Sequence, residues 1–141
     1  MPSSDSGRRA VDTSVAIADL DAGHSAHRAC VTALAGRTAA LSGHAAFETY
    51  SVLTRLPGPI RVLPADARTS LEAAFPEACW LAPGDQQELL RRVADLGIVG
   101  GAIYDALVGE AARADGRLLL TRDHRARQTY DLLGISYQLV G

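Results

Sequence analysis

The sequence predicts an α/β fold: a three-layer α/β/α sandwich around a central, mainly parallel sheet. Short apolar runs, such as the three leucines of GRLLLTRD at 116–123, alternate along the chain with longer segments whose apolar residues recur at helical spacing. Continuous apolar runs are typical of strands covered by helices on both faces, and alternation of strands with helices favours a parallel sheet. With 141 residues, 48% hydrophobic and 21% charged, the chain is expected to form one globular domain.

The elements are expected in the order β-α-α-β-α-α-β-α-α-β-α-β. The segment AVDTSVAIADLD at 10–21 begins as a strand and continues as a helix, since its apolar residues change from a continuous run to helical spacing. The other strands are expected at TAALS (38–42), ACWLA (78–82), RLLLT (117–121) and SYQLV (136–140). The other helices are expected at 25–36, 44–56, 65–75, 84–97, 103–116 and 123–134.

Glycine and proline mark the limits of these elements. Gly36, Gly97 and Gly116 each follow a helical segment in the position that favours a left-handed residue, and PGP at 57–59 ends the helix before it. Residues 1–9 (MPSSDSGRR) are polar and rich in turn formers. A flexible N-terminal segment is therefore expected at 1–9, followed by a single domain at 10–141.

The charge balance limits the kinds of partner. The net charge is −2 and all 14 basic residues are arginine, so the chain does not bind nucleic acid through bulk positive charge. An RNA partner would be held by a local patch or by metal ions. Cys30 and Cys79 fit no metal-ligand spacing and are expected to be buried free thiols. With neither a signal-peptide pattern nor a long apolar run, the expected location is the cytoplasm.

Four of the sixteen acidic residues have apolar neighbours: Asp12, Glu48, Asp105 and Asp123. Carboxylates are rarely buried unless they are paired or bound to a metal. In a parallel α/β sheet the strand ends and helix starts meet at one edge, so all four should face one crevice. Their mutual repulsion is relieved by a divalent cation, and oxygen-only ligands suit Mg²⁺ or Mn²⁺.

Each acid also has a simpler interpretation when it is taken alone. Asp12 and Asp123 could cap the helices that follow them. Glu48 could lie on the solvent face of an amphipathic helix, and Asp105 could simply favour a helix N-terminus.

The motifs VDTSV, FETYSVLTRL, GGAIYDAL and LLLTRDHR, in this order, resemble the PIN-domain family and in particular its VapC-type toxins. The resemblance runs from about residue 10 to the C-terminus. It implies a ribonuclease dependent on Mg²⁺ or Mn²⁺, which cleaves RNA with a metal-activated water. The catalytic and metal-binding quartet falls on Asp12, Glu48, Asp105 and Asp123. The family's small polar residues near the metal match Ser14 and Thr121.

The resemblance further implies a homodimer and a cognate antitoxin, which commonly blocks the site with an arginine. Apolar helix surface in AHRACVTALAG and LEAAFPEACWLA also favours a homodimer. Arg122 is expected either to point away from the site or to contact a substrate phosphate. His124 has the same two possibilities, RNA contact or a solvated surface.

Three other functions fit part of the pattern. A phosphatase or receiver-like domain could use Asp12 as a nucleophile, but a second aspartate is replaced by Ser14 and the chain has no lysine. The acids could instead be structural in an inactive RNA- or protein-binding module. The chain could also be an RNA-processing nuclease without an antitoxin.

Overall fold

The computed structural model describes residues 7–141 and contains a five-stranded sheet in the order β3-β2-β1-β4-β5, with every pair of neighbours parallel. The strands are β1 (Arg8–Val11), β2 (Thr38–Ser42), β3 (Glu77–Cys79), β4 (Leu118–Thr121) and β5 (Tyr137–Leu139). The helices are α1 (Thr13–Leu20), α2 (His27–Leu34), α3 (Ala45–Thr54), α4 (Pro64–Ala74), α5 (Pro83–Asp95), α6 (Ala102–Ala114) and α7 (Arg127–Leu133), with a 3-10 turn at Gly58–Ile60. The predicted fold class and element order are confirmed.

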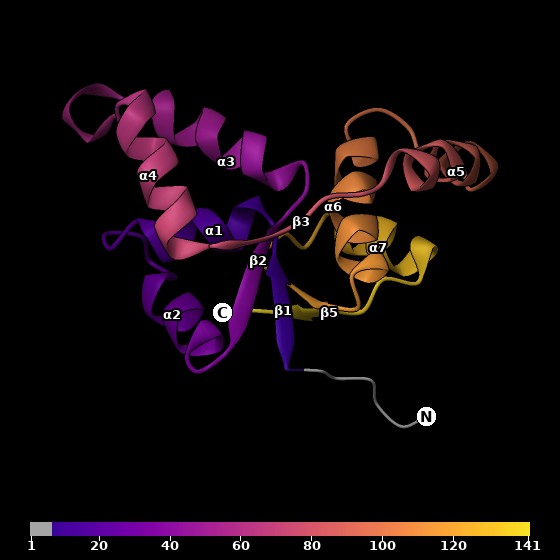
Figure 1. The fold of residues 1–141 in the computed structure, drawn as a ribbon, viewed down its shortest axis with the longest axis horizontal. Helices are drawn as coiled ribbons and strands as arrows, with labels where there is room; N and C mark the ends of the chain where they lie inside the picture. The colour runs from indigo at the N-terminus through magenta and orange to yellow at the C-terminus, as the bar shows by residue number, and fades with distance from the viewer. Residues whose placement is uncertain (1–6) are drawn as a thin grey trace.

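The helices form the outer layers of the sandwich. Helices α1–α4 gather on one side of the strands and α5–α7 on the other (Figure 1). This division follows from the right-handed crossover of parallel strands, because the chain moves from β1 to β2 and β3 in one direction and from β4 to β5 in the other. None of the helices within residues 7–141 is long and apolar enough to cross a membrane.

The core lies between the central strands and the helices on either side. Val11, Leu119 and Leu120 are almost inaccessible to solvent, as continuous apolar runs in the two central strands require. Tyr130 of α7 is the largest fully buried side chain among the described residues. Both cysteines are buried free thiols, as expected.

Most boundaries differ from the expectation by one or a few residues, and three of these differences affect the site or the surface. Strand β1 begins at Arg8, two residues before the expected start of the domain, because Arg8 and Arg9 pair in register with β2. Residues 1–6 of the expected flexible segment lie outside the described residues. Strand β3 ends at Cys79, which leaves Trp80 beyond it with 57% of its surface exposed. Helix α7 begins only at Arg127, because residues 123–126 form a turn.

Candidate active site

The carboxyl ends of β1 and β4 lie side by side at the centre of the sheet. Val11 is in register with Leu120, so the next residues along each strand, Asp12 and Thr121, are neighbours across the pair. The connections from β1 and β4 leave in opposite directions. In open α/β sheets a crevice forms at such a reversal, and it is the usual place for a ligand.

Asp12 is buried at this crevice and is held by four hydrogen-bond donors. It caps α1: its Oδ1 accepts from the Val15 N–H at 3.3 Å and from the Ser14 hydroxyl at 2.6 Å. Its Oδ2 accepts from the Thr121 hydroxyl and, at 3.2 Å, from the Tyr130 hydroxyl. A carboxylate offers about four lone-pair positions, so the protein itself fills all of them.

Burial dominates the electrostatics of Asp12. Desolvation raises the pKa of this carboxyl group, and the hydrogen bonds from Ser14, Thr121, Val15 and Tyr130 oppose the rise. The four donors favour the ionised form, since each of them donates to a carboxylate oxygen. Asp12 thus acts both as the cap of α1 and as a buried carboxyl group of the crevice.

Ser14 and Thr121 also connect Asp12 to the segment after β4. The Ser14 hydroxyl oxygen accepts from the Arg122 N–H at 2.8 Å, and the Thr121 hydroxyl oxygen accepts from the Asp123 N–H at 3.0 Å. The start of α1 is therefore tied to the end of β4 through two hydroxyl groups. Both residues were predicted to lie near the metal, and both contact Asp12 directly.

The other three acids approach Asp12 from different elements: Glu48 from α3, Asp105 from α6 and Asp123 from the segment after β4. Burial, followed by the charges of Asp123, Glu48 and Asp12, raises the pKa of Asp105 to about 6. Burial also raises the pKa of Glu48, with Asp12 and Asp123 adding to the rise and His44 opposing it. The fold thus brings all four predicted carboxylates within electrostatic range of one another.

Electrostatic range is longer than the length of a metal–ligand bond. Within residues 7–141 no three His, Cys, Asp or Glu side chains are grouped closely enough to hold a metal ion as they stand. The donors at the crevice are all oxygens, the type that hard ions such as Mg²⁺ prefer. Mg²⁺ typically keeps several waters and uses one or two carboxylates directly, which an open set of acids of this kind can provide.

Asp123 does not cap α7 from the N-cap position, which belongs to Ala126. Its Oδ1 instead accepts from the backbone N–H of Arg125 at 2.9 Å and of Ala126 at 3.3 Å. These bonds form a side-chain-to-backbone turn, which aspartate favours. The turn delays the start of the helix.

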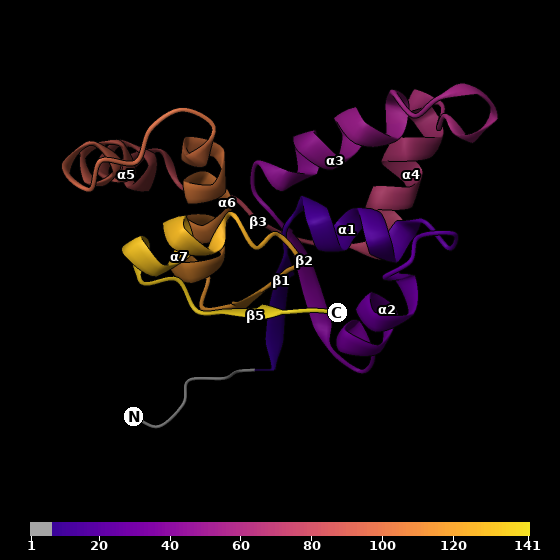
Figure 2. The ribbon, with the colours of Figure 1, turned by 180° about the vertical axis from the view of Figure 1, so that it is seen from behind.

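Arg122 and His124 flank Asp123 but lie differently from it. The Arg122 guanidinium packs against Gly141 and near Ala29 of α2, and its Nε has no hydrogen-bond partner among the described residues. Figure 2 shows the C-terminus beside α2, on the far side of the sheet from α6. His124 is exposed.

Tyr130 joins the site although nothing in its local sequence marks it. In DHRARQTYDLLG it occupies an ordinary apolar position of a helix, and its contact with Asp12 spans 118 residues of chain. Tyr130 reaches the site only through the packing of α7, for which the sequence around it carries no signal.

Comparison with known proteins identifies the family of this chain. A family model described as "PIN domain" matches residues 9–132, which is most of the chain. The chain belongs to the PIN-domain family. Its PIN domain is 49% identical over 126 residues to Ribonuclease VapC27 of Mycobacterium tuberculosis, covering 89% of this chain and 92% of the relative. It is 45% identical over 138 residues to Ribonuclease VapC40 of the same organism, covering 93% and 98%.

A solved structure also shares the architecture of this PIN domain. The crystal structure of VapBC2 from Rickettsia felis bound to a DNA fragment from their promoter superposes with a TM-score of 0.66, covering 95% of this chain and 99% of that chain. The sequence identity is 14%, so this likeness shows the fold alone.

Proposed function

We propose that the protein is a VapC-type PIN ribonuclease that depends on Mg²⁺ or Mn²⁺ and acts as the toxin of a toxin–antitoxin pair. The observation that carries the ribonuclease activity is the 45–49% identity, over nearly the whole chain, to proteins named as VapC ribonucleases. The electrostatic coupling of Asp12, Glu48, Asp105 and Asp123 at one crevice supports the metal dependence.

Each residue of the proposed site has a role that follows from its surroundings. Asp12, Glu48, Asp105 and Asp123 would hold the ion, and Ser14 and Thr121 would orient Asp12 through the hydrogen bonds described above. A bound divalent ion would polarise the scissile phosphate and lower the pKa of water. Because the acids repel phosphate when no ion is present, the chain alone should bind RNA poorly.

The test is cleavage of RNA by the purified protein with Mg²⁺, with Mn²⁺ and with EDTA. We expect cleavage with either ion and none with EDTA, restored when the ion is added back. A nuclease that cleaves equally well in EDTA would contradict the metal dependence, and an inactive protein with both ions would favour a binding module. A phosphatase would instead release phosphate from small esters without cutting RNA.

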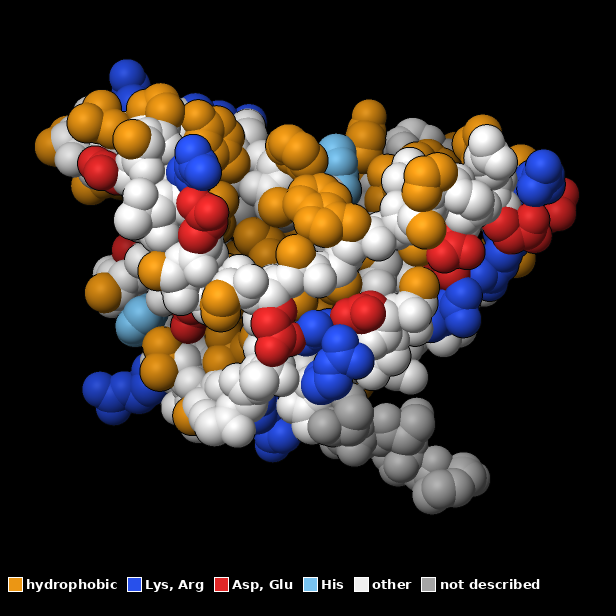
Figure 3. All heavy atoms as spheres, in the orientation of Figure 1, with side chains coloured by type: hydrophobic (Ala, Val, Ile, Leu, Met, Phe, Trp, Pro, Cys, Tyr) orange, Lys and Arg blue, Asp and Glu red, His pale blue; other side chains and the backbone are white. Residues whose placement is uncertain are grey.

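The proposed partners are a cognate antitoxin and a second copy of the chain. The structural neighbour, VapBC2 bound to a DNA fragment from their promoter, supports an antitoxin partner here. Exposed apolar side chains also support protein partners. The exposed rings of Phe47 in α3 and Trp80 pack edge to face, with their centroids 5.6 Å apart. Both side chains help to line a hollow of about 230 Å³ between α3 and α6. Figure 3 shows hydrophobic side chains gathered on this face.

Growth of bacteria tests the role of a toxin. Expression of the protein alone should stop growth, and co-expression of the antitoxin should restore it. An antitoxin arginine fits a cluster of carboxylates electrostatically. Normal growth on verified expression of soluble, active nuclease would favour an RNA-processing nuclease without an antitoxin.

A further inference from the structure

The Tyr130 hydroxyl is a buried polar group that donates to the carboxylate of Asp12. The side chain is 1% exposed, and its hydroxyl lies 3.2 Å from Oδ2 of Asp12. Burial and the nearby negative charges raise the pKa of this phenol, so it remains a hydrogen-bond donor at neutral pH. A buried tyrosine normally needs a partner for its hydroxyl group, and in this chain the partner is the most buried acid of the site.

The position of the ring depends on Gly109. Helices α6 and α7 lie side by side in Figures 1 and 2, and Gly109 of α6 faces the Tyr130 ring. A Cβ on Gly109 would lie 2.9 Å from Cδ1 of Tyr130, which is too close for real atoms, and 3.1 Å from Cγ1 of Ile135, which is also tight. The absence of a side chain at Gly109 therefore lets the ring reach Asp12.

The two oxygens of Asp12 have different surroundings. Oδ2 is held by Thr121 and Tyr130, which are both buried. Oδ1 is held by the Val15 N–H and by Ser14, which is only partly buried and whose hydroxyl group can rotate. Oδ1 is therefore the oxygen that can exchange one of its partners for a ligand in the crevice.

We propose that Tyr130 is a positioning residue: its hydroxyl, with that of Thr121, fixes Oδ2 of Asp12 and thereby presents Oδ1 to the divalent ion. This inference rests on the proposed function, in which Asp12 is one of the groups that hold the ion. Hydrogen-bond partners of ligating side chains commonly contribute 10- to 100-fold to metal affinity.

Tyr130→Phe tests the role by removing one oxygen atom while keeping the ring. We expect the dissociation constant for Mn²⁺, measured by calorimetry on the metal-free protein, to rise about tenfold. RNA cleavage should fall at low Mn²⁺ concentration and recover towards the wild-type rate at saturating Mn²⁺. Tyr137→Phe is the matched control, since its hydroxyl donates to the exposed Asp131 at 2.8 Å, and its Mn²⁺ affinity should equal that of the wild type.

Gly109→Ala is a second, independent variant because it keeps the hydroxyl group but displaces the ring. It should weaken Mn²⁺ binding as Tyr130→Phe does, whereas Gly84→Ala, in a helix position with open space around it, should not. Melting temperatures of the metal-free variants show whether a change in Mn²⁺ affinity comes from a loss of fold stability. If the folded Tyr130→Phe protein binds Mn²⁺ as tightly as the wild type, the positioning role of Tyr130 is overturned, while the proposed metal dependence stands. Failure of the wild type to bind either ion would overturn the proposed metal dependence as well.

Discussion

The pKa of Asp105 gives the sharpest residue-scale prediction, because it is raised from 3.8 to about 6 in the folded protein. Folding then favours the protonated form, so this group's contribution to stability is complete below about pH 4 and is lost as the pH rises through about 6. A shift of this size corresponds to roughly 3 kcal/mol. Since Asp105 is partly exposed, we reduce the expected effect to about 1–2 kcal/mol.

Asp105→Asn should therefore stabilise the metal-free protein at neutral pH. Urea unfolding in EDTA should be measured at several pH values from acid to neutral. As the pH rises, the free energy of unfolding should fall less for the variant than for the wild type. The same variant should lose metal binding, so that Mg²⁺ raises its melting temperature less. If the free energy of unfolding depends on pH in the same way in the variant and the wild type, burial and the neighbouring acids do not raise the pKa of Asp105 as described.

Asp123→Asn separates two roles of one side chain. Its Oδ1 accepts two backbone N–H groups, and the amide oxygen of asparagine can accept both of them. We expect the stability of the metal-free protein to change by less than about 0.5 kcal/mol, while RNA cleavage falls at least about a hundredfold if Asp123 holds the ion. Asp21→Asn is the control, because Asp21 makes a similar turn with Gly23 at the opposite end of α1 from Asp12. Full activity in Asp123→Asn would leave Asp123 with a structural role only.

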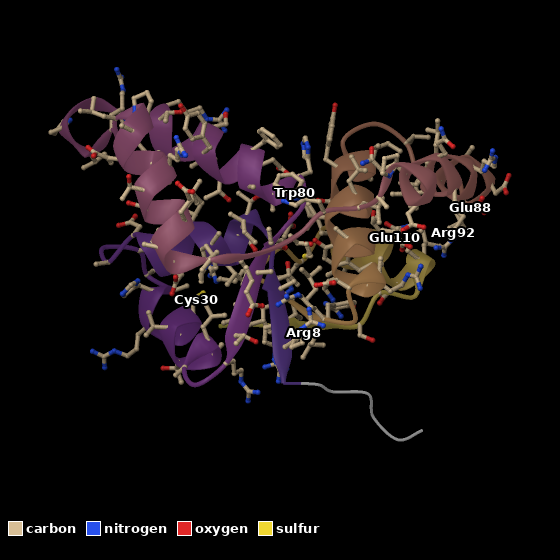
Figure 4. The ribbon with its side chains drawn as sticks, viewed as in Figure 1. Arg8, Cys30, Trp80, Glu88, Arg92 and Glu110 are labelled. Atoms are coloured by element: carbon tan, nitrogen blue, oxygen red, sulfur yellow. The ribbon has the colours of Figure 1, made fainter. Side chains whose placement is uncertain are left out.

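At the scale of elements, Glu110 links three helices on one side of the sheet. This buried carboxylate of α6 pairs with Arg113 one turn further on and, at 3.6 Å, with Arg92 of α5. Arg92 also donates to the carbonyl of Leu133 in α7 at 3.3 Å. Figure 4 shows Glu110 and Arg92 between α6 and α5.

Glu110→Gln should lower the free energy of unfolding by about 2 kcal/mol, the range for hydrogen bonds to charged groups. The loss stays below that of a fully buried pair, because Arg92 and Arg113 are partly exposed and can be solvated. Glu72→Gln, in the exposed pair with Arg68, should cost no more than about 0.5 kcal/mol. Chemical denaturation of the two variants gives the comparison, and equal losses would contradict the importance of burial.

The element pattern could be predicted from sequence because each strand and helix has a local signal. Apolar runs, helical spacing and glycine stops placed every strand and α-helix in the right order, but not the 3-10 turn at Gly58–Ile60. The beginning of α7 was predicted at residue 123 because a side-chain turn at Asp123 has the same sequence signature as a helix cap. The contacts of Tyr130 and Glu110 could not be predicted, since they depend on how helices far apart in sequence pack together. Gly109 matters for Tyr130 only once α7 lies against α6.

At the scale of the whole molecule, the apolar face that contains the exposed Phe47 and Trp80 predicts self-association. Light scattering should give about twice the 14.8 kDa mass of one chain at high micromolar concentration. Trp80→Glu should weaken the dimer, because a large exposed aromatic side chain commonly contributes most to an interface. A monomeric wild type would contradict the predicted homodimer without affecting the nuclease role.

The hydrogen bonds that hold Asp12 have a consequence for synthesis on the ribosome. Asp12 precedes its partners Thr121 and Tyr130 by 109 and 118 residues along the chain. Contacts so distant along the chain form late in folding, after the intervening segments have closed their loops. A nascent chain in which β4 and α7 have not yet folded therefore lacks both hydroxyl groups that hold Oδ2 of Asp12. The set of hydrogen bonds around Asp12 is therefore complete only after β4 and α7 have been made and have packed against β1 and α1.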